Sequence, residues 1–394
     1  MQQPKLRFKE FTQEIKQQKL ANCIEEFDGY ETLTSGYPLM TSARTGLMYQ
    51  SDFRAAKSTE SETTKFSLLP VGYCTYRHMS DDDIFHFNIN DFETPGLVSQ
   101  EYPVFNTKEG YDLKYIVEYL NSSLSFRAFC RQQKLGGTRT RLYFKNLVKF
   151  NICTPSLEEQ KKITSLLSAV DKTIAILEED LELWEEKKKG VIQKLLTREK
   201  RFTSPTNQYP DWTTIPLKDI LTEYHEKSPK GASYEHVSLT REGVVPKSER
   251  YDRDFLVTTD EKQYRVTHIN DICYNPANLK FGVICRNKYK DAIFSPIYVT
   301  YKVNNGFSPE FIEIIVTRND FINYALKYQQ GTVYERMSVA SSDLLSIEVD
   351  VPCYEEQVDI ANCISKLNDI VTIKQQKIEC WKNIKAGLLQ QLFV

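Results

Sequence analysis

The sequence predicts an α+β protein built by internal duplication, in which two globular segments are each followed by a long helix. Three observations support this prediction: the second half of the 394-residue chain repeats the first, two segments carry a heptad pattern, and the segments before them alternate short β-rich runs with turns. The predicted boundaries are 1–154 and 201–351 for the globular segments and 155–200 and 352–394 for the helical ones.

The repeat is clearest when the chain is shifted against itself by 197 residues. Between 155–196 and 352–393, 13 of the 42 aligned positions are identical without a gap, including Glu158-Glu159-Gln160 and Glu355-Glu356-Gln357. Weaker matches such as Leu20 with Leu217 and Gly46 with Gly243 extend into the globular segments. Such a duplication suggests a molecule that performs one task twice, with two divergent inserts on a shared frame.

The helical segments show a coiled-coil pattern. Ser156 followed by Glu159 fits a capping box at the start of the first helix. Apolar residues then dominate the heptad positions of both copies. These positions are Ile163, Leu167, Val170, Ile174, Leu177, Leu181, Trp184, Lys188, Val191 and Leu195, and Ile360, Ile364, Leu367, Val371, Lys374, Ile378, Trp381, Lys385, Leu388 and Leu392. We expect the two copies to pack on each other and bury both Trp rings; the alternative is that each pairs with another chain.

Composition excludes several classes of protein. The apolar fraction of 41% and charged fraction of 26% are those of a soluble globular protein, and no apolar run is long enough to cross a membrane. The N-terminal segment lacks the apolar core of a signal peptide, which favours a cytoplasmic protein. The nine cysteines are scattered without a CxxC pair, so we expect buried thiols rather than disulfides or zinc ligands.

The most basic segment of the chain is 127–149, which contains no Asp or Glu although the net charge is −2. Its basic residues are Arg127, Arg131, Lys134, Arg139, Arg141, Lys145 and Lys149. Gly136 and Gly137 allow close approach of a partner to the backbone, and Tyr143 and Phe144 add aromatic rings. This composition favours binding of a polyanion such as DNA; a solvated helix and loop is the alternative.

The second half has a thinner basic cluster in 274–290. The candidate DNA-binding residues there are Tyr274, Asn275, Lys280, Arg286 and Lys288, with Lys290 nearby and Arg336 in the stretch that matches Arg139. Asn275 and Asn278 could bond adenine edges, but Asn275-Pro276 fits a turn at least as well.

Catalytic motifs are absent from the sequence. It has neither a GxxxxGK[ST] phosphate loop nor a GxGxxG fingerprint, and NPAN at 275–278 lacks the second Pro and the aromatic residue of an amino-methyltransferase motif. The acidic run Asp81-Asp82-Asp83 suits a solvated loop better than a metal site. We therefore expect a non-catalytic binding protein without its own metal or cofactor.

The order of these segments resembles the specificity subunit (HsdS) of type I restriction-modification systems, over essentially the whole chain. The motifs that carry the resemblance are the two PxxxEEQxxI helix starts, GTRTRLYFKNLVKFNICTPSLEEQ with its counterpart GTVYERMSVASSDLLSIEVDVPCYEEQ, and the terminal KAGLLQQLFV. One departure is that a Trp common near the start of each half stands at 212 but is replaced by Ile15 in the first half.

The resemblance implies a fold and a set of partners. Each globular segment would be a target recognition domain that reads one half of a bipartite double-stranded DNA sequence. The two helices would form an antiparallel coiled coil that relates the domains by a pseudo-twofold axis. Two modification subunits carrying S-adenosylmethionine, and restriction subunits carrying ATP and Mg²⁺, would bind this subunit, which itself is not an enzyme. A scaffold that binds other proteins rather than DNA is the alternative function.

Helix length gives this expectation a scale. A helix over 158–196 would span about 58 Å, which is enough to hold two readers on successive major grooves about 34–36 Å apart. Changing that length by four residues would move one reader by about 6 Å, so we expect such a change to alter the nonspecific spacer of the target.

Overall fold

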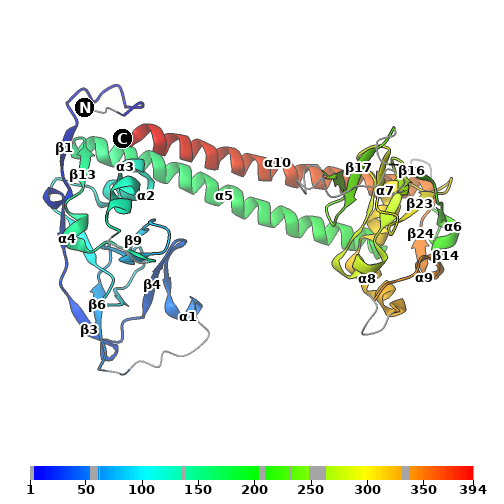
Figure 1. The fold of residues 1–394 in the computed structure, drawn as a ribbon, viewed down its shortest axis with the longest axis horizontal. Helices are drawn as coiled ribbons and strands as arrows, with labels where there is room; N and C mark the ends of the chain where they lie inside the picture. Colours follow the sequence, from blue (N-terminus) through cyan, green and yellow to red (C-terminus); the bar gives the residue numbers. More distant parts are fainter. Residues whose placement is uncertain are drawn as a thin grey trace. The chain divides into compact units, whose positions relative to one another are not determined.

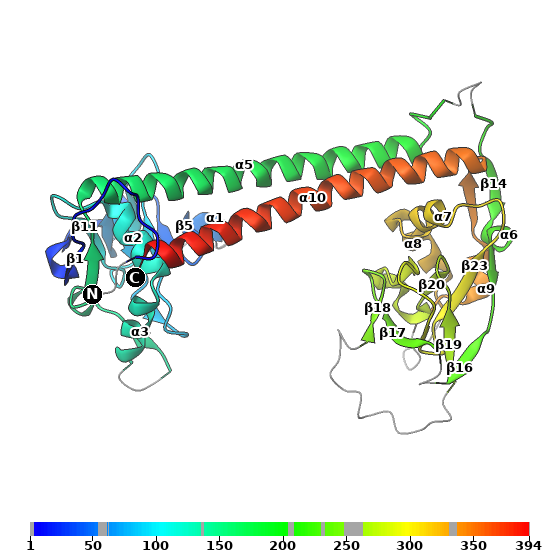
Figure 2. The ribbon, with the colours of Figure 1, turned by 90° about the horizontal axis from the view of Figure 1, so that it is seen from above.

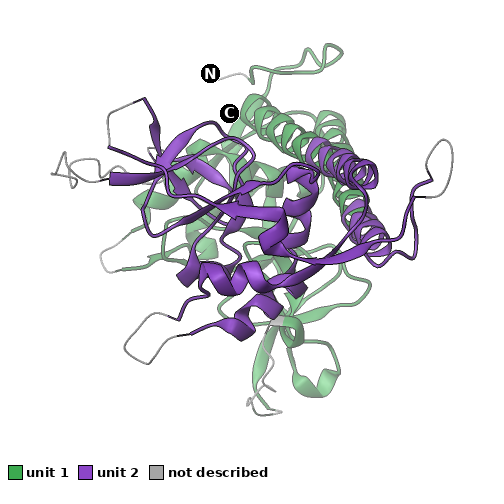
Figure 3. Ribbon diagram, turned by 90° about the vertical axis from the view of Figure 1, so that its right-hand side faces the viewer, with its two compact units in different colours: residues 1–182, 374–394 green, residues 183–373 purple. Residues whose placement is uncertain are grey.

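The computed structural model describes residues 4–53, 61, 63–134, 138–203, 209–229, 233–247, 263–330 and 337–393. The chain divides into two compact units (Figure 3): unit 1 comprises residues 1–182 and 374–394, and unit 2 comprises residues 183–373. Each unit contains the first part of one long helix and the last part of the other, because both helices continue through the boundary between the units.

The two long helices predicted from the heptads are present (Figure 1): α5 (Leu157–Leu196) has 40 residues and α10 (Tyr354–Leu392) has 39. Within unit 1 they lie side by side (Figures 1 and 2). Ion pairs there join Asp171 to Lys385, Glu178 to Lys382 and Asp180 to Lys374. Residue numbers rise along one helix as they fall along the other, so the predicted antiparallel pairing within one chain is confirmed.

The predicted seam is buried unevenly. Ile163, Val170, Ile174, Ile360, Val371 and Ile378 are buried, whereas Leu177, Leu181, Leu367 and Leu388 are only partly buried. The expected burial of both Trp rings is wrong, since Trp184 and Trp381 are also only partly buried. A two-helix pair covers one side of each seam residue, so large rings in the middle of the pair keep an exposed edge.

Unit 1 is an α+β domain built on two small sheets. The first has the strand order β2-β11-β7-β9, with every pair antiparallel, and the second has the order β10-β6-β3. A two-stranded hairpin, β4-β5, joins the second sheet through a parallel bridge between Leu39 and Leu97. The elements are β1 (Lys16–Lys19), β2 (Ile24–Glu26), β3 (Tyr30–Thr32), β4 (Met40–Ala43), β5 (Gly46–Tyr49), α1 (Gln50–Phe53), β6 (Lys65–Leu69), β7 (Cys74–Tyr76), β8 (Met79–Ser80), β9 (Phe87–Ile89), β10 (Gly96–Val98), β11 (Val104–Thr107), α2 (Leu113–Ser122), α3 (Leu124–Gln132), β12 (Thr140–Arg141), α4 (Phe144–Leu147) and β13 (Asn151–Thr154).

Unit 2 repeats the main sheets of this arrangement, and among its described strands only the β8-β12 pair lacks a counterpart. Its four-stranded sheet has the order β15-β23-β20-β21, and its five-stranded sheet β16-β19-β22-β17-β18 includes a parallel pair where unit 1 has the Leu39–Leu97 bridge. The elements are β14 (Thr213–Pro216), α6 (Leu217–Ile220), β15 (Leu221–Glu223), β16 (Lys227–Pro229), β17 (Glu235–Leu239), β18 (Val244–Pro246), β19 (Gln263–Thr267), β20 (Ile272–Tyr274), η5 (Pro276–Phe281), β21 (Ile284–Arg286), β22 (Ala292–Phe294), β23 (Val299–Val303), α7 (Pro309–Val316), α8 (Asn319–Ala325), η6 (Leu326–Tyr328), α9 (Ser341–Ser346) and β24 (Glu348–Val351). The duplication seen in the sequence therefore extends through both domains.

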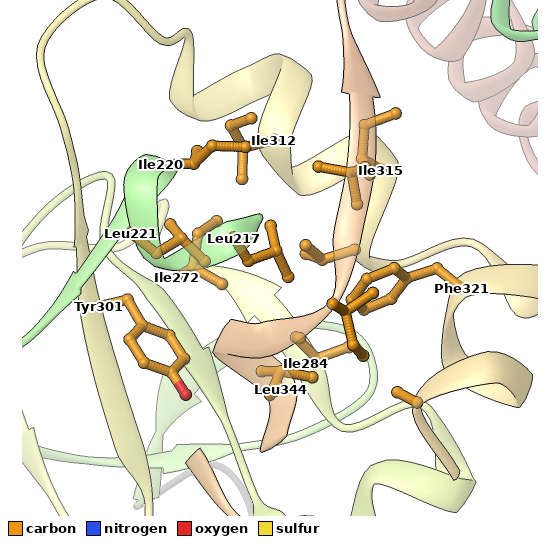
Figure 4. Close-up of a cluster of buried hydrophobic side chains, with 14 of the residues drawn as sticks. Leu217, Ile220, Leu221, Ile272, Ile284, Tyr301, Ile312, Ile315, Phe321 and Leu344 are labelled. Atoms are coloured by element: carbon orange, nitrogen blue, oxygen red, sulfur yellow. The ribbon is translucent and has the colours of Figure 1, made fainter. Parts of the chain in front are cut away.

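Each unit has its own hydrophobic core, to which the long helices contribute. In unit 2 the buried side chains of α6, the sheet and α7, such as Leu217, Tyr301 and Ile312, pack together (Figure 4). Ile360 and Ile364 from the first turns of α10 belong to this core. The core of unit 1 likewise includes Ile163 and Leu167 of α5 and Leu392 of α10. The ends of the helices are thus integral parts of the domains.

The Glu-Glu-Gln motif attaches each domain to the helix that follows it. In unit 1 the buried carboxylate of Glu159 accepts hydrogen bonds from Nε and Nη2 of Arg7, both at 2.8 Å. The next residue, Gln160, accepts from the backbone N–H of Asp112 and donates to the carbonyl of Pro155, both at 2.9 Å. The motif therefore ties the N-terminal segment and the start of α2 to the first turn of α5.

Unit 2 repeats these bonds atom for atom. The Glu356 carboxylate accepts from Nε and Nη2 of Arg201 at 3.0 and 2.7 Å. Gln357 accepts from the N–H of Ser308 and donates to the carbonyl of Pro352, both at 2.9 Å. We call these two arrangements the Arg–Glu clasps. The sequence showed the motif, but its arginine partners lie about 150 residues earlier and were not predicted.

Among the described residues no helix is both long and apolar enough to traverse a bilayer. Five of the nine cysteines are buried, three are partly buried and Cys380 is exposed, which corrects the expectation of uniformly buried thiols.

Candidate nucleic-acid interface

The acidic run of unit 1 positions basic and polar side chains. Its residues follow β8, which pairs with β12 of the basic segment. Asp81 Oδ1 pairs with Arg139 Nε at 2.8 Å, and Asp82 Oδ2 pairs with Arg44 Nη2 at 2.6 Å. The third carboxylate, that of Asp83, accepts a hydrogen bond from the Thr140 hydroxyl. The run thus connects the tip of the β4-β5 hairpin with the basic segment.

The charged groups of this surface shift the pKa values of their neighbours. The Ser80 hydroxyl and the Arg44 guanidinium lower the pKa of Asp82, so this carboxylate is ionised at neutral pH. Burial lowers the pKa of His86, and the positive charges of Arg44 and Arg127 lower it further. Both arginines are therefore close enough to act on one imidazole. A hollow of about 500 Å³ lies here, with Arg44, Asp81 and His86 in its lining.

The basic residues described in the segment 127–149 are exposed. Arg127 and Arg131 lie on α3, one turn apart, and Lys134 follows the helix. Arg141 lies on β12 and Lys145 on α4. None of these five forms an ion pair within the described part of the chain, whereas Arg139 is held by Asp81. Gly136 and Gly137 lie outside the described residues.

An exposed aromatic ring interrupts this basic surface. Tyr143 stacks on the His78 ring with centroids 5.1 Å apart, and Lys145 Nζ lies 5.8 Å from the Tyr143 centroid. The His78 ring is held in turn by the carbonyl of Glu101, 2.5 Å from Nδ1. An exposed ring with a cation beside it offers both stacking and charge to a nucleic acid.

Two of the residues predicted in unit 2 are structural, which corrects those predictions. Tyr274 is 0% exposed, stacks on Tyr301 and donates its hydroxyl hydrogen bond to the carbonyl of Val339. It occupies the place of Tyr76 in unit 1, whose hydroxyl donates to Leu142. The sequence placed an aromatic residue beside basic ones but could not show that its ring faces the core.

Asn275 is buried and caps η5, because its Oδ1 accepts from the backbone N–H of Ala277 at 3.1 Å. The turn alternative for Asn275-Pro276 is therefore the correct one.

The basic residues of unit 2 have mixed environments. The side chain of Arg286 is only 15% exposed and pairs with Glu310 and Glu313, so its guanidinium is already neutralised. Lys288 is exposed and pairs with Glu313. Lys280 is exposed, with its amine 5.0 Å from the centroid of Phe281. Arg336 lies outside the described residues.

Two exposed arginines were missed by the sequence analysis. Arg44 and Arg241 each lie at the tip of a hairpin, two residues before Gly46 and Gly243. The match of these two glycines in the repeat was the available signal, but only pairing of the strands shows that the arginines beside them are equivalent. No cluster of His, Cys, Asp and Glu within the described ranges could hold a metal ion.

These features define a class of protein: two duplicated α+β domains, joined by paired long helices, with exposed basic side chains on loops and hairpins. Residues 42–184 match the family model of the type I restriction modification DNA specificity domain. The chain is thus similar, in this domain and in its curated relatives, to the HsdS family, the specificity subunits of type I restriction-modification systems.

Individual relatives agree in sequence and in fold. The putative type I restriction enzyme MjaX specificity subunit of Methanocaldococcus jannaschii is 24% identical over 317 residues, which cover 74% of this chain and 68% of the relative. The fold is similar to the S subunit from M. genitalium, with a TM-score of 0.57 and 14% identity over 100% of this chain and 99% of that one. It is also similar to a chain from a type I restriction-modification assembly, with a TM-score of 0.54 and 11% identity over 96% and 97%.

Proposed function

We propose that this chain is the DNA sequence-recognition subunit of a type I restriction-modification complex. Residues 1–154 and 201–351 each read one half-site of a bipartite target, and the helices at 155–200 and 352–394 set the distance between them. The chain itself performs no chemistry. S-adenosylmethionine is bound by two modification subunits, and ATP with Mg²⁺ by restriction subunits that join the complex.

The observation that carries this proposal is the duplication. Both units have the same strand order, the same helix attachment through Arg7–Glu159 and Arg201–Glu356, and an arginine at the tip of the same hairpin. The surface loops between these shared elements differ in sequence. Two equal frames with different loops suit the reading of two different half-sites, because base contacts come from surface side chains rather than from the core.

The helices supply a candidate surface for the modification subunits. Ile176 and Ile373 are equivalent positions of the repeat, and their side chains are 54% and 62% exposed in the middle of α5 and α10. Large apolar side chains exposed on a helix are frequent at protein interfaces. Two equivalent positions fit two copies of one partner.

The basic surface of unit 1 can be tested by substitution. We expect Arg141→Ala to weaken binding to every duplex and to reduce the salt slope by about one, if its guanidinium contacts a phosphate. A bidentate base contact would instead cost about 1–3 kcal/mol at one position of the half-site. Arg139→Ala should also weaken binding at this half-site, while freeing Asp81. The measurement is a titration of duplex DNA with the full chain in complex with its modification partners, at several salt concentrations.

A charge-matched control separates local contacts from net charge. Lys108→Ala removes one positive charge from a side chain that bonds the carbonyl of Ala21, outside the basic segment. If Arg139→Ala and Arg141→Ala change the affinity and the salt slope no more than this control does, the basic surface is not part of the DNA interface.

The alternative is a coiled-coil scaffold that binds other proteins and not DNA, and the exposed isoleucines of the helices would suit it equally. Salt distinguishes the two functions. Neutralisation of several phosphates makes log affinity fall linearly with log salt, by about 0.9 per phosphate, whereas a scaffold would show no DNA binding with this dependence.

A further inference from the structure

The β4-β5 hairpin of unit 1 presents an arginine at its tip. Ala43 pairs with Gly46, so only Arg44 and Thr45 form the turn. Gly46 has φ +128°, a conformation that residues with a Cβ rarely adopt, and it allows this tight reversal. The Arg44 side chain is 61% exposed at the end of the hairpin.

Unit 2 has an equivalent hairpin tip 197 residues later in the sequence. The backbone N–H of Thr240 donates to the carbonyl of Gly243, so that Arg241 and Glu242 form a two-residue tip between β17 and β18. Gly243 has φ +135°, and Arg241 is exposed. An arginine and a positive-φ glycine two residues later therefore recur in two domains whose surface loops otherwise differ.

Each arginine rests on the loop between the two equivalent strands of the four-stranded sheet. Arg44 is held by Asp82 in the loop between β7 and β9. Arg241 lies over Gly282 in the loop between β20 and β21, where a Cβ built on that glycine would be 3.7 Å from its Cγ and Nε. The two equivalent arginines are therefore supported by different groups.

The hairpins themselves are firmly anchored. In unit 1 the Asn88 side-chain amide donates to the Ser42 hydroxyl at 2.8 Å and to the Ala43 carbonyl at 2.9 Å. In unit 2 the hairpin side chains Val237 and Leu239 belong to a buried cluster with Cys285, which is the counterpart of Asn88. A fixed hairpin keeps its tip arginine in a defined position, as direct reading of a base edge requires.

We propose that Arg44 and Arg241 are equivalent specificity-determining residues, each donating two hydrogen bonds to a guanine edge in the half-site of its own domain. This inference rests on the proposed function and adds to it which residues read the sequence. Arg is the side chain best suited to the O6 and N7 acceptors of guanine in the major groove.

The surroundings of Arg44 favour a base over a phosphate. The ionised carboxylate of Asp82 pairs with its guanidinium and offsets its positive charge, which weakens the attraction of a phosphate group. A guanine edge carries no net charge. The hydrogen bond to Asp82 uses Nη2, and a guanidinium has four further N–H donors beyond one such bond.

The test compares the sequence preference of single variants. Full-length wild-type protein, with its modification partners, selects duplexes from a random library, and the bound pool is sequenced. Arg44→Lys and Arg44→Ala should each lose the preference for one G·C pair in one half-site only, and Arg241→Lys and Arg241→Ala should do so in the other half-site only. Affinity for the wild-type target should fall about 5- to 150-fold, with affinity for unrelated DNA unchanged.

The Lys variants keep the positive charge, so they separate base reading from simple attraction and are milder to the fold. Arg318→Ala is a matched control, because Arg318 is paired with Asp320 as Arg44 is with Asp82 but lies at the start of α8. Unchanged motifs in the Arg44 and Arg241 variants, or an equal loss of affinity for all duplexes, would overturn the inference. A wild-type complex that selects no motif at all would instead overturn the proposed function.

Discussion

At the scale of single residues, the two buried carboxylates at the helix starts are held in place by paired hydrogen bonds. The side chains of Glu159 and Glu356 are 2% and 1% exposed, and each accepts two hydrogen bonds from one guanidinium. A buried carboxylate is costly unless it is paired and hydrogen-bonded. The clasps meet that requirement, and they link segments far apart in sequence at the point where each helix leaves its domain.

The clasp of unit 1 is tested by a double-mutant cycle. We expect Arg7→Met to lower the free energy of unfolding by about 3–5 kcal/mol, because it leaves the Glu159 carboxylate buried without a cation. The double variant Arg7→Met, Glu159→Gln should recover part of this loss, since the buried charge is then removed as well. Chemical denaturation followed by circular dichroism measures the difference. A double variant no more stable than Arg7→Met would show that the carboxylate is not the source of the loss.

At the scale of elements, the long helices have two roles along their length. The first turns of α10 lie in the core of unit 2, where Ile360 is 1% exposed among the sheet and α7 side chains. Further along, Leu367 is not among the residues of that core and stays partly exposed. The heptad pattern predicts burial at both positions, but only Ile360 also packs in the core of the domain.

This difference predicts unequal costs of truncation. We expect Ile360→Ala to lower the free energy of unfolding of unit 2 by about 2–5 kcal/mol, because it opens a cavity in a closed core. Leu367→Ala should cost clearly less, since its side chain already contacts water and little cavity forms. Denaturation midpoints of the two variants provide the comparison, and equal losses would contradict the distinction.

At the scale of the whole molecule, the duplication produces two domains on uninterrupted helices. A 40-residue helix such as α5 is about 60 Å long, and its length is independent of the loops that face a ligand. In the proposed function, the helices set the distance between the half-sites and the loops of each domain determine the sequence of its half-site. The two properties are therefore independent.

Lengthening both helices tests whether the spacer can change without a change in the half-sites. Insertion of seven residues near the middle of α5, matched by seven in α10, preserves the heptad register and adds about 10 Å. We expect the methylated target to keep both half-sites and to gain about three base pairs of nonspecific spacer. Sequencing of modified bases in cells that carry the variant measures the new target. An active variant with the original spacer would refute the role of the helices in setting the distance.

The candidate site was predicted only in part from the sequence. The acid-free run at 127–149 indicated an exposed basic surface, and Arg127, Arg131 and Arg141 are exposed. In the second half the same criterion failed for Arg286 and Tyr274, because the acidic partners of one and the core packing of the other come from distant segments.

By itself, the sequence determined the duplication, the α+β class and the two long helices, because identities at a fixed offset and heptad periodicity are local properties of the chain. Only the tertiary structure decided which polar side chains meet: Arg7 with Glu159, Arg44 with Asp82, and Arg139 with Asp81. Such pairs depend on strand order and on the loops that bring remote residues within hydrogen-bonding distance. The periodicity of a single chain does not predict which remote residues lie close together.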